Sequence, residues 1–239
     1  MHDRLKKNKI TIISEIHPQH HGSMDELKRM VLQSKIGGAD YVKVQLYSSK
    51  KLFNNNDRKY VELTKEELKE IANYSRKIGI ETIASVFDEE RIKWCEDLKF
   101  KLYKIASLTI KNKQLCKKII STNKPVIASL GMYNFRKKGT PFKSKNVSYL
   151  YCISKYPTNL SEVKMPDFKK SFFTGYSDHT VGIGTCLHAV SRGAKIIEKH
   201  FTLNKAINCE TEKAHVCSMN FEDLKTLREN ADILSTLNS

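Results

Sequence analysis

Short apolar runs alternate with amphipathic stretches along the whole chain. The runs, rich in β-branched and aromatic residues, predict eight strands, over residues 9–16, 41–46, 81–86, 102–107, 125–130, 147–154, 171–177 and 195–202. Apolar positions three or four residues apart predict helices over residues 24–36, 65–78, 89–98, 113–122, 182–192 and 221–237. No linker or low-complexity segment interrupts the alternation, so we expect one continuous α/β domain over residues 1–239.

Eight strands that alternate with helices favour a (β/α)8 barrel, the TIM-barrel fold. One segment departs from the pattern. Residues 131–146 contain Gly139 and Pro141 and lack apolar periodicity, so we expect the fifth helix to be shortened or replaced by a loop. In such a barrel the functional groups gather at the C-terminal ends of the strands.

The composition narrows the class of protein. The chain has 42 Lys and Arg against 26 Asp and Glu, and its net charge of +16 suits anionic ligands. The lysines are scattered over nearly every predicted helix, which disfavours nucleic acid as a partner. No apolar run could span a bilayer and no signal peptide is evident, so we expect a cytoplasmic protein without a membrane partner. Six cysteines without a C-x-x-C pair are expected to be reduced.

Two strings near the C-terminus carry candidate metal ligands. Residues 175–180 read Gly-Tyr-Ser-Asp-His-Thr, and residues 198–202 read Glu-Lys-His-Phe-Thr. Because strand side chains alternate between faces, Glu198 and His200 point the same way, and His179 follows the neighbouring strand. Neutral imidazoles beside a carboxylate suit a divalent cation. Either string alone would also fit an ordinary turn or core histidine.

Lysines and serines occupy the ends of other strands. Lys43 and Lys104 lie on strands two and four. A lysine that points into a barrel needs a partner, and an anionic ligand would supply one. The hydroxyls of Ser85, Ser107, Ser129 and Ser177 could add donors for a phosphate and a carboxylate, although serines at strand ends also cap the backbone.

Seven strings, in order along nearly the whole chain, resemble the N-acetylneuraminate (sialic acid) synthase family. They are Glu15-Ile16-(x)3-His20-x-Gly22, Gly38-Ala39-Asp40-x-Val42-Lys43-x-Gln45, Tyr103-Lys104-Ile105-Ala106-Ser107, Pro125-Val126-Ile127-Ala128-Ser129-x-Gly131-Met132, Tyr156-Pro157-Thr158, and the two histidine strings at residues 175–180 and 198–202. The histidine strings are the most specific of the seven.

The resemblance implies an enzyme that condenses phosphoenolpyruvate with an N-acetylated hexosamine such as N-acetylmannosamine, giving a nonulosonic acid and phosphate. It implies a divalent metal, commonly Mn²⁺ with Mg²⁺ or Co²⁺ as alternatives, held by His179 and His200. Phosphoenolpyruvate would contact Lys43, Ser85, Lys104, Ser107, Ser129 and Ser177, with Ser154 at a position where the family usually has Asn. Glu15 and Glu198 would orient or deprotonate water, and Gln45 and Tyr156 would contact the sugar or metal-bound water.

Three departures from the family pattern concern the sugar. Thr109 and Ala214 stand where the family has sugar-binding carboxylates, and Glu210 or Glu212 is a candidate substitute for the second. We also expect this protein to be without the C-terminal antifreeze-like domain that in many members reaches over a partner's site. We therefore expect an altered acceptor and either a homodimer or a separate lid domain. The alternative is a non-catalytic barrel that binds phosphoenolpyruvate and metal.

Overall fold

The computed structural model describes residues 9–207 and 213–237. Eight parallel strands form a closed barrel in chain order, and β8 pairs with β1 to complete it. The strands are β1 (Thr11–Glu15), β2 (Tyr41–Leu46), β3 (Glu81–Val86), β4 (Tyr103–Ile105), β5 (Val126–Ser129), β6 (Val147–Cys152), β7 (Phe173–Asp178) and β8 (Ile196–His200). This confirms the predicted TIM barrel, and every strand boundary lies within two residues of the predicted one.

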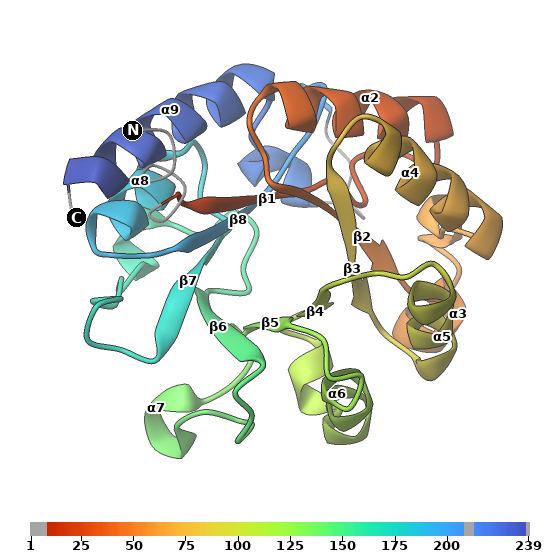
Figure 1. The fold of residues 1–239 in the computed structure, drawn as a ribbon, viewed down its shortest axis with the longest axis horizontal. Coiled ribbons are helices and arrows are strands. Elements are labelled where there is room, and N and C mark those ends of the chain that lie inside the picture. The colour runs from red at the N-terminus through yellow and green to blue at the C-terminus, as the bar shows by residue number, and fades with distance from the viewer. Residues whose placement is uncertain (1–8, 208–212, 238–239) are drawn as a thin grey trace.

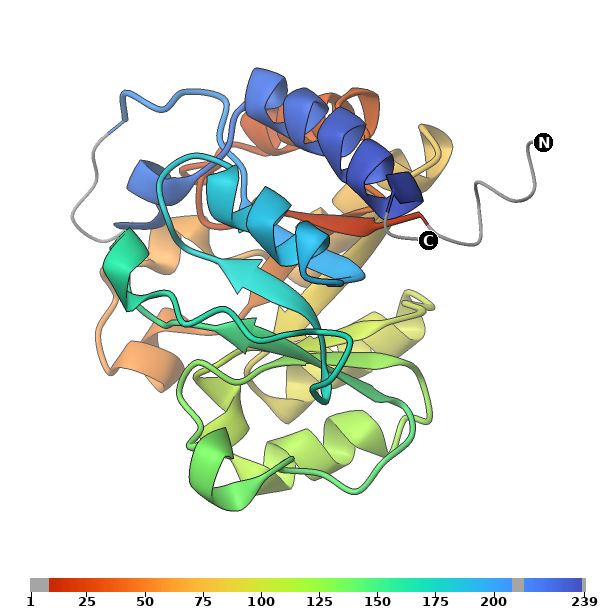
Figure 2. The same ribbon diagram turned by 90° about the vertical axis from the view of Figure 1, so that its left-hand side faces the viewer.

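Helices pack around the outside of the strand ring (Figure 1). The longer ones are α2 (Met24–Ile36), α4 (Lys65–Lys77), α5 (Glu89–Asp97), α6 (Lys113–Ile120), α8 (Gly184–Ser191) and α9 (Phe221–Leu237). Polar caps fix where several of them begin: Thr64 and Glu67 form a reciprocal capping box at the start of α4. Helices α8 and α9 lie side by side along one flank of the barrel (Figure 2).

Two connections lack a full helix. The β5–β6 connection has only the single turn α7 (Phe135–Lys138), which confirms the predicted shortening of the fifth helix. The β6–β7 connection has only the 3₁₀ turn η3 (Leu160–Glu162), in a stretch where the sequence pattern predicted no helix. Other short elements follow strands: α3 (Ser49–Phe53) and η1 (Lys59–Val61) after β2, η2 (Thr109–Lys111) after β4, and η4 (Lys213–Cys217) after β8.

The barrel interior is layered because strand side chains repeat every second residue. One layer is an apolar cluster of buried side chains, Ile13, Ile83, Ile127 and Leu150. Two residues further along the same strands stand Glu15, Ser85, Ser129 and Cys152, all buried. The apolar layer therefore closes the barrel beneath a polar layer, and the polar layer forms the floor of the site.

Two further expectations concern the environment of the chain. Over the described ranges 9–207 and 213–237, no helix is both long and apolar enough to cross a bilayer. The cysteines of those ranges, Cys95, Cys116, Cys152, Cys186 and Cys217, are buried free thiols.

Candidate active site

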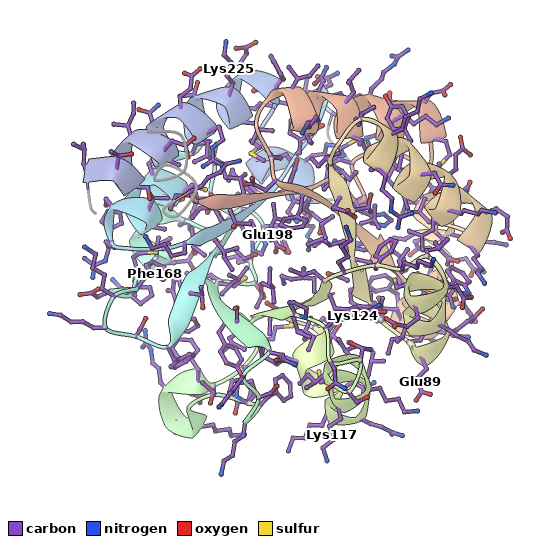
Figure 3. All side chains as sticks on the ribbon, viewed as in Figure 1. Glu89, Lys117, Lys124, Phe168, Glu198 and Lys225 are labelled. Atoms are coloured by element: carbon purple, nitrogen blue, oxygen red, sulfur yellow. The ribbon has the colours of Figure 1, made fainter. Side chains whose placement is uncertain are left out.

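The C-terminal mouth of the barrel holds a cavity that gathers most of the predicted site residues. Glu15, Lys43, Gln45, Lys104, Ser107, Ser129, Ser154, Tyr156, Ser177, His179, Glu198 and His200 all line it. Ser85 is the exception, because it lies beneath Lys43, whose Nζ is 3.4 Å from the Ser85 hydroxyl. Figure 3 shows Glu198 inside the strand ring, whereas Glu89, Lys117 and Lys225 lie at its periphery.

Lys43 is paired within the protein. Its Nζ lies 2.5 Å from Oε2 of Glu15 and 3.2 Å from Oε2 of Glu198. The sequence reasoning named an anionic ligand as a partner for such a lysine, and the barrel itself places two carboxylates, from β1 and β8, beside the ammonium. Although burial opposes the charge, these two carboxylates raise the pKa of Lys43 above its ordinary value, so Lys43 is protonated at neutral pH.

Lys104 lies farther from a carboxylate than Lys43 does. Its Nζ donates to the Ser129 hydroxyl at 2.7 Å and to the Ile105 carbonyl at 3.1 Å, and it lies 3.6 Å from Oε1 of Glu198. Burial lowers the pKa of Lys104 to about 8, against the opposing attraction of Glu198. The two lysines therefore differ, since Lys104 loses its proton much nearer to neutral pH than Lys43.

The two carboxylates also differ. Burial would raise the pKa of Glu198, but Lys104 and Lys43 outweigh it and lower the pKa to about 2. The Ser177 hydroxyl donates to Oε1 of Glu198 at 2.9 Å. Burial raises the pKa of Glu15 more than Lys43 lowers it. Glu198 is thus a fixed anion between two ammonium groups.

A close backbone approach shapes the wall formed by the ends of β4, β5 and β6. The Gly131 N–H donates to the Ser107 hydroxyl at 3.1 Å. A Cβ at Gly131 would lie 2.4 Å from the Ser154 hydroxyl oxygen, so any larger residue there would force the Ser154 side chain to move. The Ser154 hydroxyl is buried and has no hydrogen-bond partner among the described residues. Ser107 and Ser154 therefore form a polar corner whose unsatisfied hydroxyl suits a ligand oxygen.

His179 and His200 face each other on the opposite wall. Their ring centroids are 5.8 Å apart, and the Tyr156 ring packs against His179 at 4.1 Å. Nδ1 of His179 donates to the Ile153 carbonyl at 2.7 Å. Nδ1 of His200 lies 3.2 Å from the amide oxygen of Gln19. With Nδ1 of each ring facing an acceptor, Nε2 is the nitrogen that would be left to bind a metal.

The residues present suit a metal site with few protein ligands, in which some coordination positions are left open. Across residues 9–207 and 213–237, no group of three or more His, Cys, Asp or Glu side chains is arranged to hold an ion. His179 and His200 would thus be the protein ligands, and the remaining coordination positions would fall to water and substrate oxygens, as at catalytic rather than structural sites.

A second buried ion pair lies directly behind the two histidines. Asp178 and Lys199 precede them on β7 and β8, so their side chains point away from the cavity. Nζ of Lys199 lies 2.6 Å from Oδ2 of Asp178, and both side chains are fully buried. Asp178 also accepts from the Tyr176 hydroxyl and the Thr180 N–H, each at 2.9 Å. This network ties together the strand ends that carry His179 and His200.

Comparison with known proteins shows the family to which this barrel belongs. The model of the NeuB family matches residues 30–238. The chain belongs to the NeuB family. It is 34% identical to an uncharacterized protein of Methanocaldococcus jannaschii over 95% of this chain and 71% of that protein. It is 32% identical to N,N'-diacetyllegionaminic acid synthase of Campylobacter jejuni over 92% of this chain and 74% of that enzyme.

A solved structure agrees in three dimensions. The crystal structure of N-acetylneuraminic acid (sialic acid) synthetase from Leptospira borgpetersenii, in complex with citrate, superposes with a TM-score of 0.86 at 27% sequence identity. The match covers 97% of this chain and 85% of that one. The sequence resemblance to sialic acid synthases is therefore confirmed, and the fold of this NeuB-family chain is theirs.

Several residues of this NeuB-family site escaped the sequence reasoning. The outer part of the cavity is lined by Leu52, Phe53, Arg58, Phe87, Leu108 and Met132. The Arg58 guanidinium packs over the Phe53 ring at 4.8 Å. Most of these residues lie in connections without strong periodicity. The one available signal was the concentration of apolar residues directly after strand ends.

The positions where this chain departs from the family pattern lie away from the cavity wall. Thr109 is buried in η2, and its hydroxyl has no hydrogen-bond partner among the described residues. Ala214 is buried in η4, where its carbonyl accepts from the Ser218 hydroxyl at 2.8 Å. Neither residue lines the cavity. Glu210 and Glu212, the candidate substitutes, lie outside the described residues.

Proposed function

We propose that this protein condenses phosphoenolpyruvate with an N-acetylated hexosamine resembling N-acetylmannosamine, forms a nonulosonic (sialic-type) acid and releases phosphate. The observation that carries the proposal is the meeting of two lysines and two glutamates on the floor of the cavity that His179 and His200 border. The synthase names of the C. jejuni and L. borgpetersenii relatives support it.

Phosphoenolpyruvate binds at the floor. Lys43 and Lys104 give it two ammonium groups, and the hydroxyls of Ser107, Ser154 and Ser177 give it neutral donors. Because both lysines already face carboxylates, the phosphate and carboxylate of the ligand replace part of those ion pairs. The internal carboxylates hold both ammonium groups inside the cavity, so the lysines are already positioned and exchange partners when the substrate binds.

The acceptor sugar lies between the histidines and the outer wall. A divalent cation, most suitably Mn²⁺ with Mg²⁺ or Co²⁺ as alternatives, supplies Lewis-acid polarisation of the sugar aldehyde when bound. His179 and His200 would hold this cation. Gln45 and Tyr156 contact the sugar, and Phe53 and Phe87 pack against its outer carbons.

The reaction also requires a water molecule that adds to C2 of phosphoenolpyruvate. C3 of phosphoenolpyruvate attacks the aldehyde carbon, water adds to C2, and phosphate leaves with the C2–O bond electrons. Glu15 and Glu198 orient this water and take its proton. Glu15 is the better placed to accept the proton, because Glu198 already bridges two ammonium groups.

The test is turnover. The purified protein is incubated with Mn²⁺, phosphoenolpyruvate and a panel of N-acetylmannosamine, diacetamido hexoses and 6-phosphorylated sugars, and phosphate release and product mass are followed. We expect metal-dependent phosphate release with one acceptor class and a product mass equal to acceptor plus pyruvate.

The second candidate, a non-catalytic barrel, predicts a different result. It would bind phosphoenolpyruvate and Mn²⁺ without turnover on any acceptor, whether alone or with a separately supplied antifreeze-like domain. We include that domain because we propose a homodimer or a separate lid as the partner that closes the mouth. The rim exposes Leu108, Met132 and Tyr156 at 39%, 43% and 38%, which supports a covering partner.

A further inference from the structure

The imidazole of His200 is held by a side chain that belongs to none of the predicted site residues. Oε1 of Gln19 lies 3.2 Å from Nδ1 of His200, and the two residues are only 2% and 6% exposed. His179 differs, because its Nδ1 donates to the main-chain carbonyl of Ile153. The Cys152 sulfur also lies 3.9 Å from Nδ1 of His179, whereas the partner of Nδ1 in His200 is the amide oxygen of Gln19.

An amide oxygen can only accept a hydrogen bond. The proton shared between Gln19 and His200 must therefore lie on Nδ1. In a neutral imidazole with Nδ1 protonated, Nε2 carries the lone pair and is the nitrogen that can bind a metal. The contact thus selects the tautomer of His200 as well as the orientation of its ring.

Gln19 is held firmly enough to do this. It lies in the turn after β1, where the His21 N–H donates to the Pro18 carbonyl at 3.2 Å. The Phe201 N–H donates to the Glu15 carbonyl at 2.8 Å, which ties the end of β8 to the start of that turn. The barrel seam therefore brings a side chain from the turn after β1 to His200 on β8, 181 residues away in sequence.

The contact is not explained by folding stability. The amide nitrogen of Gln19 is buried and makes no hydrogen bond to any described residue. An unsatisfied buried donor costs free energy, so an apolar side chain of similar size would be better for folding alone. Gln19 is therefore better explained by its contact with His200 in the active site than by a contribution to folding stability.

We propose that Gln19 is a positioning residue that holds His200 in the tautomer with Nε2 free, ready to bind the cation. The inference depends on the metal-binding role of His200 within the proposed function. Outer partners of this kind typically change metal affinity about 10–100-fold when they are removed.

The first measurement needs neither metal nor substrate. The metal-free protein is labelled with ¹⁵N-histidine, and NMR at pH 8 reports which ring nitrogen of His200 carries the proton, with His200→Ala used to assign the signal. We expect the Nδ1–H tautomer in the wild type and in Gln19→Glu, which keeps an acceptor. Gln19→Met removes the acceptor, and we expect a mixture of tautomers there.

The second measurement is Mn²⁺ binding, followed by the EPR signal of free Mn²⁺. We expect Gln19→Met to weaken binding about 10–100-fold and Gln19→Glu to restore it. Gln114→Met, on the exposed surface of α6, is the matched control and should leave both readouts unchanged. An unchanged tautomer and unchanged Mn²⁺ affinity in Gln19→Met would overturn the inference, even in an active enzyme. Absence of turnover in the wild type, both alone and with a separately supplied antifreeze-like domain, would instead overturn the proposed function, while the tautomer would still decide the role of Gln19.

Discussion

Nζ of Lys43 lies 2.5 Å from Oε2 of Glu15 inside the barrel, where the two side chains are only 5% and 2% exposed. The pair means that the phosphoenolpyruvate site we propose is already filled by charges of both signs. A substrate anion competes with a carboxylate for the same ammonium group. In competing, it frees Glu15 to act on water, so substrate binding and preparation of the base are one event.

Lys43→Met tests this arrangement. We expect the variant to raise the KM for phosphoenolpyruvate about 10–100-fold, the loss of one charge-assisted hydrogen bond, with little change in the KM for the sugar. Steady-state kinetics with each substrate varied in turn provides the measurement. Lys117→Met, on the outer surface of α6, is the control. An effect confined to the sugar KM would contradict the assignment of Lys43 to phosphoenolpyruvate.

His200→Ala separates the metal site from the fold. We expect metal-dependent activity to be lost and Mn²⁺ affinity to fall by more than the roughly 10–100-fold typical of an outer partner. Circular dichroism and the melting temperature should show a folded barrel, because His200 lies at the cavity rather than in the apolar core. His188→Ala, on the exposed side of α8, should change nothing. If His200→Ala kept its Mn²⁺ affinity, His200 would not be a ligand.

Lys104 predicts a pH dependence of phosphoenolpyruvate binding. Burial lowers its pKa to about 8, so the ammonium form, which attracts the anion, is lost as the pH rises through that value. We expect the Kd of phosphoenolpyruvate to rise about tenfold between pH 7 and pH 9 if only the charged form binds. Isothermal titration calorimetry measures it. Lys104→Arg stays charged and should flatten the profile, whereas the exposed control Lys225→Arg should keep it.

The alternation of eight apolar runs with amphipathic stretches was enough to predict the barrel, and the polar residues at the strand ends together with the family resemblance predicted most of the cavity lining. Alternate residues of a strand point to the same face, and this alternation along β2 and β8 directs Lys43, Glu198 and His200 into the barrel. The alternation does not predict which of the inward side chains contact each other, since that depends on how the strands are staggered around the barrel. The Lys43–Glu15 pair was therefore missed.

Residues outside the strands were harder to predict for a related reason. Gln19, Phe53 and Arg58 reach the site from connections whose path is set by tertiary packing and not by local periodicity. Asp178 and Lys199 belong to the motifs at residues 175–180 and 198–202. That they form an ion pair linking the ends of β7 and β8 became clear only from the 2.6 Å contact in the structure.

That buried pair gives the last prediction. Lys199→Met leaves the Asp178 carboxylate buried without its cation, and removal of one partner of such a pair typically costs about 3–5 kcal/mol. We expect urea unfolding to show a loss of that size, with Mn²⁺ affinity also reduced because Asp178 and Lys199 tie together the strand ends that carry both histidines. The double variant Asp178→Asn with Lys199→Met removes both charges and should recover part of the stability. Lys195→Met, a lysine with an exposed side chain just before β8, is the control. A Lys199→Met protein as stable as the wild type would show that the pair contributes nothing to holding the two strand ends.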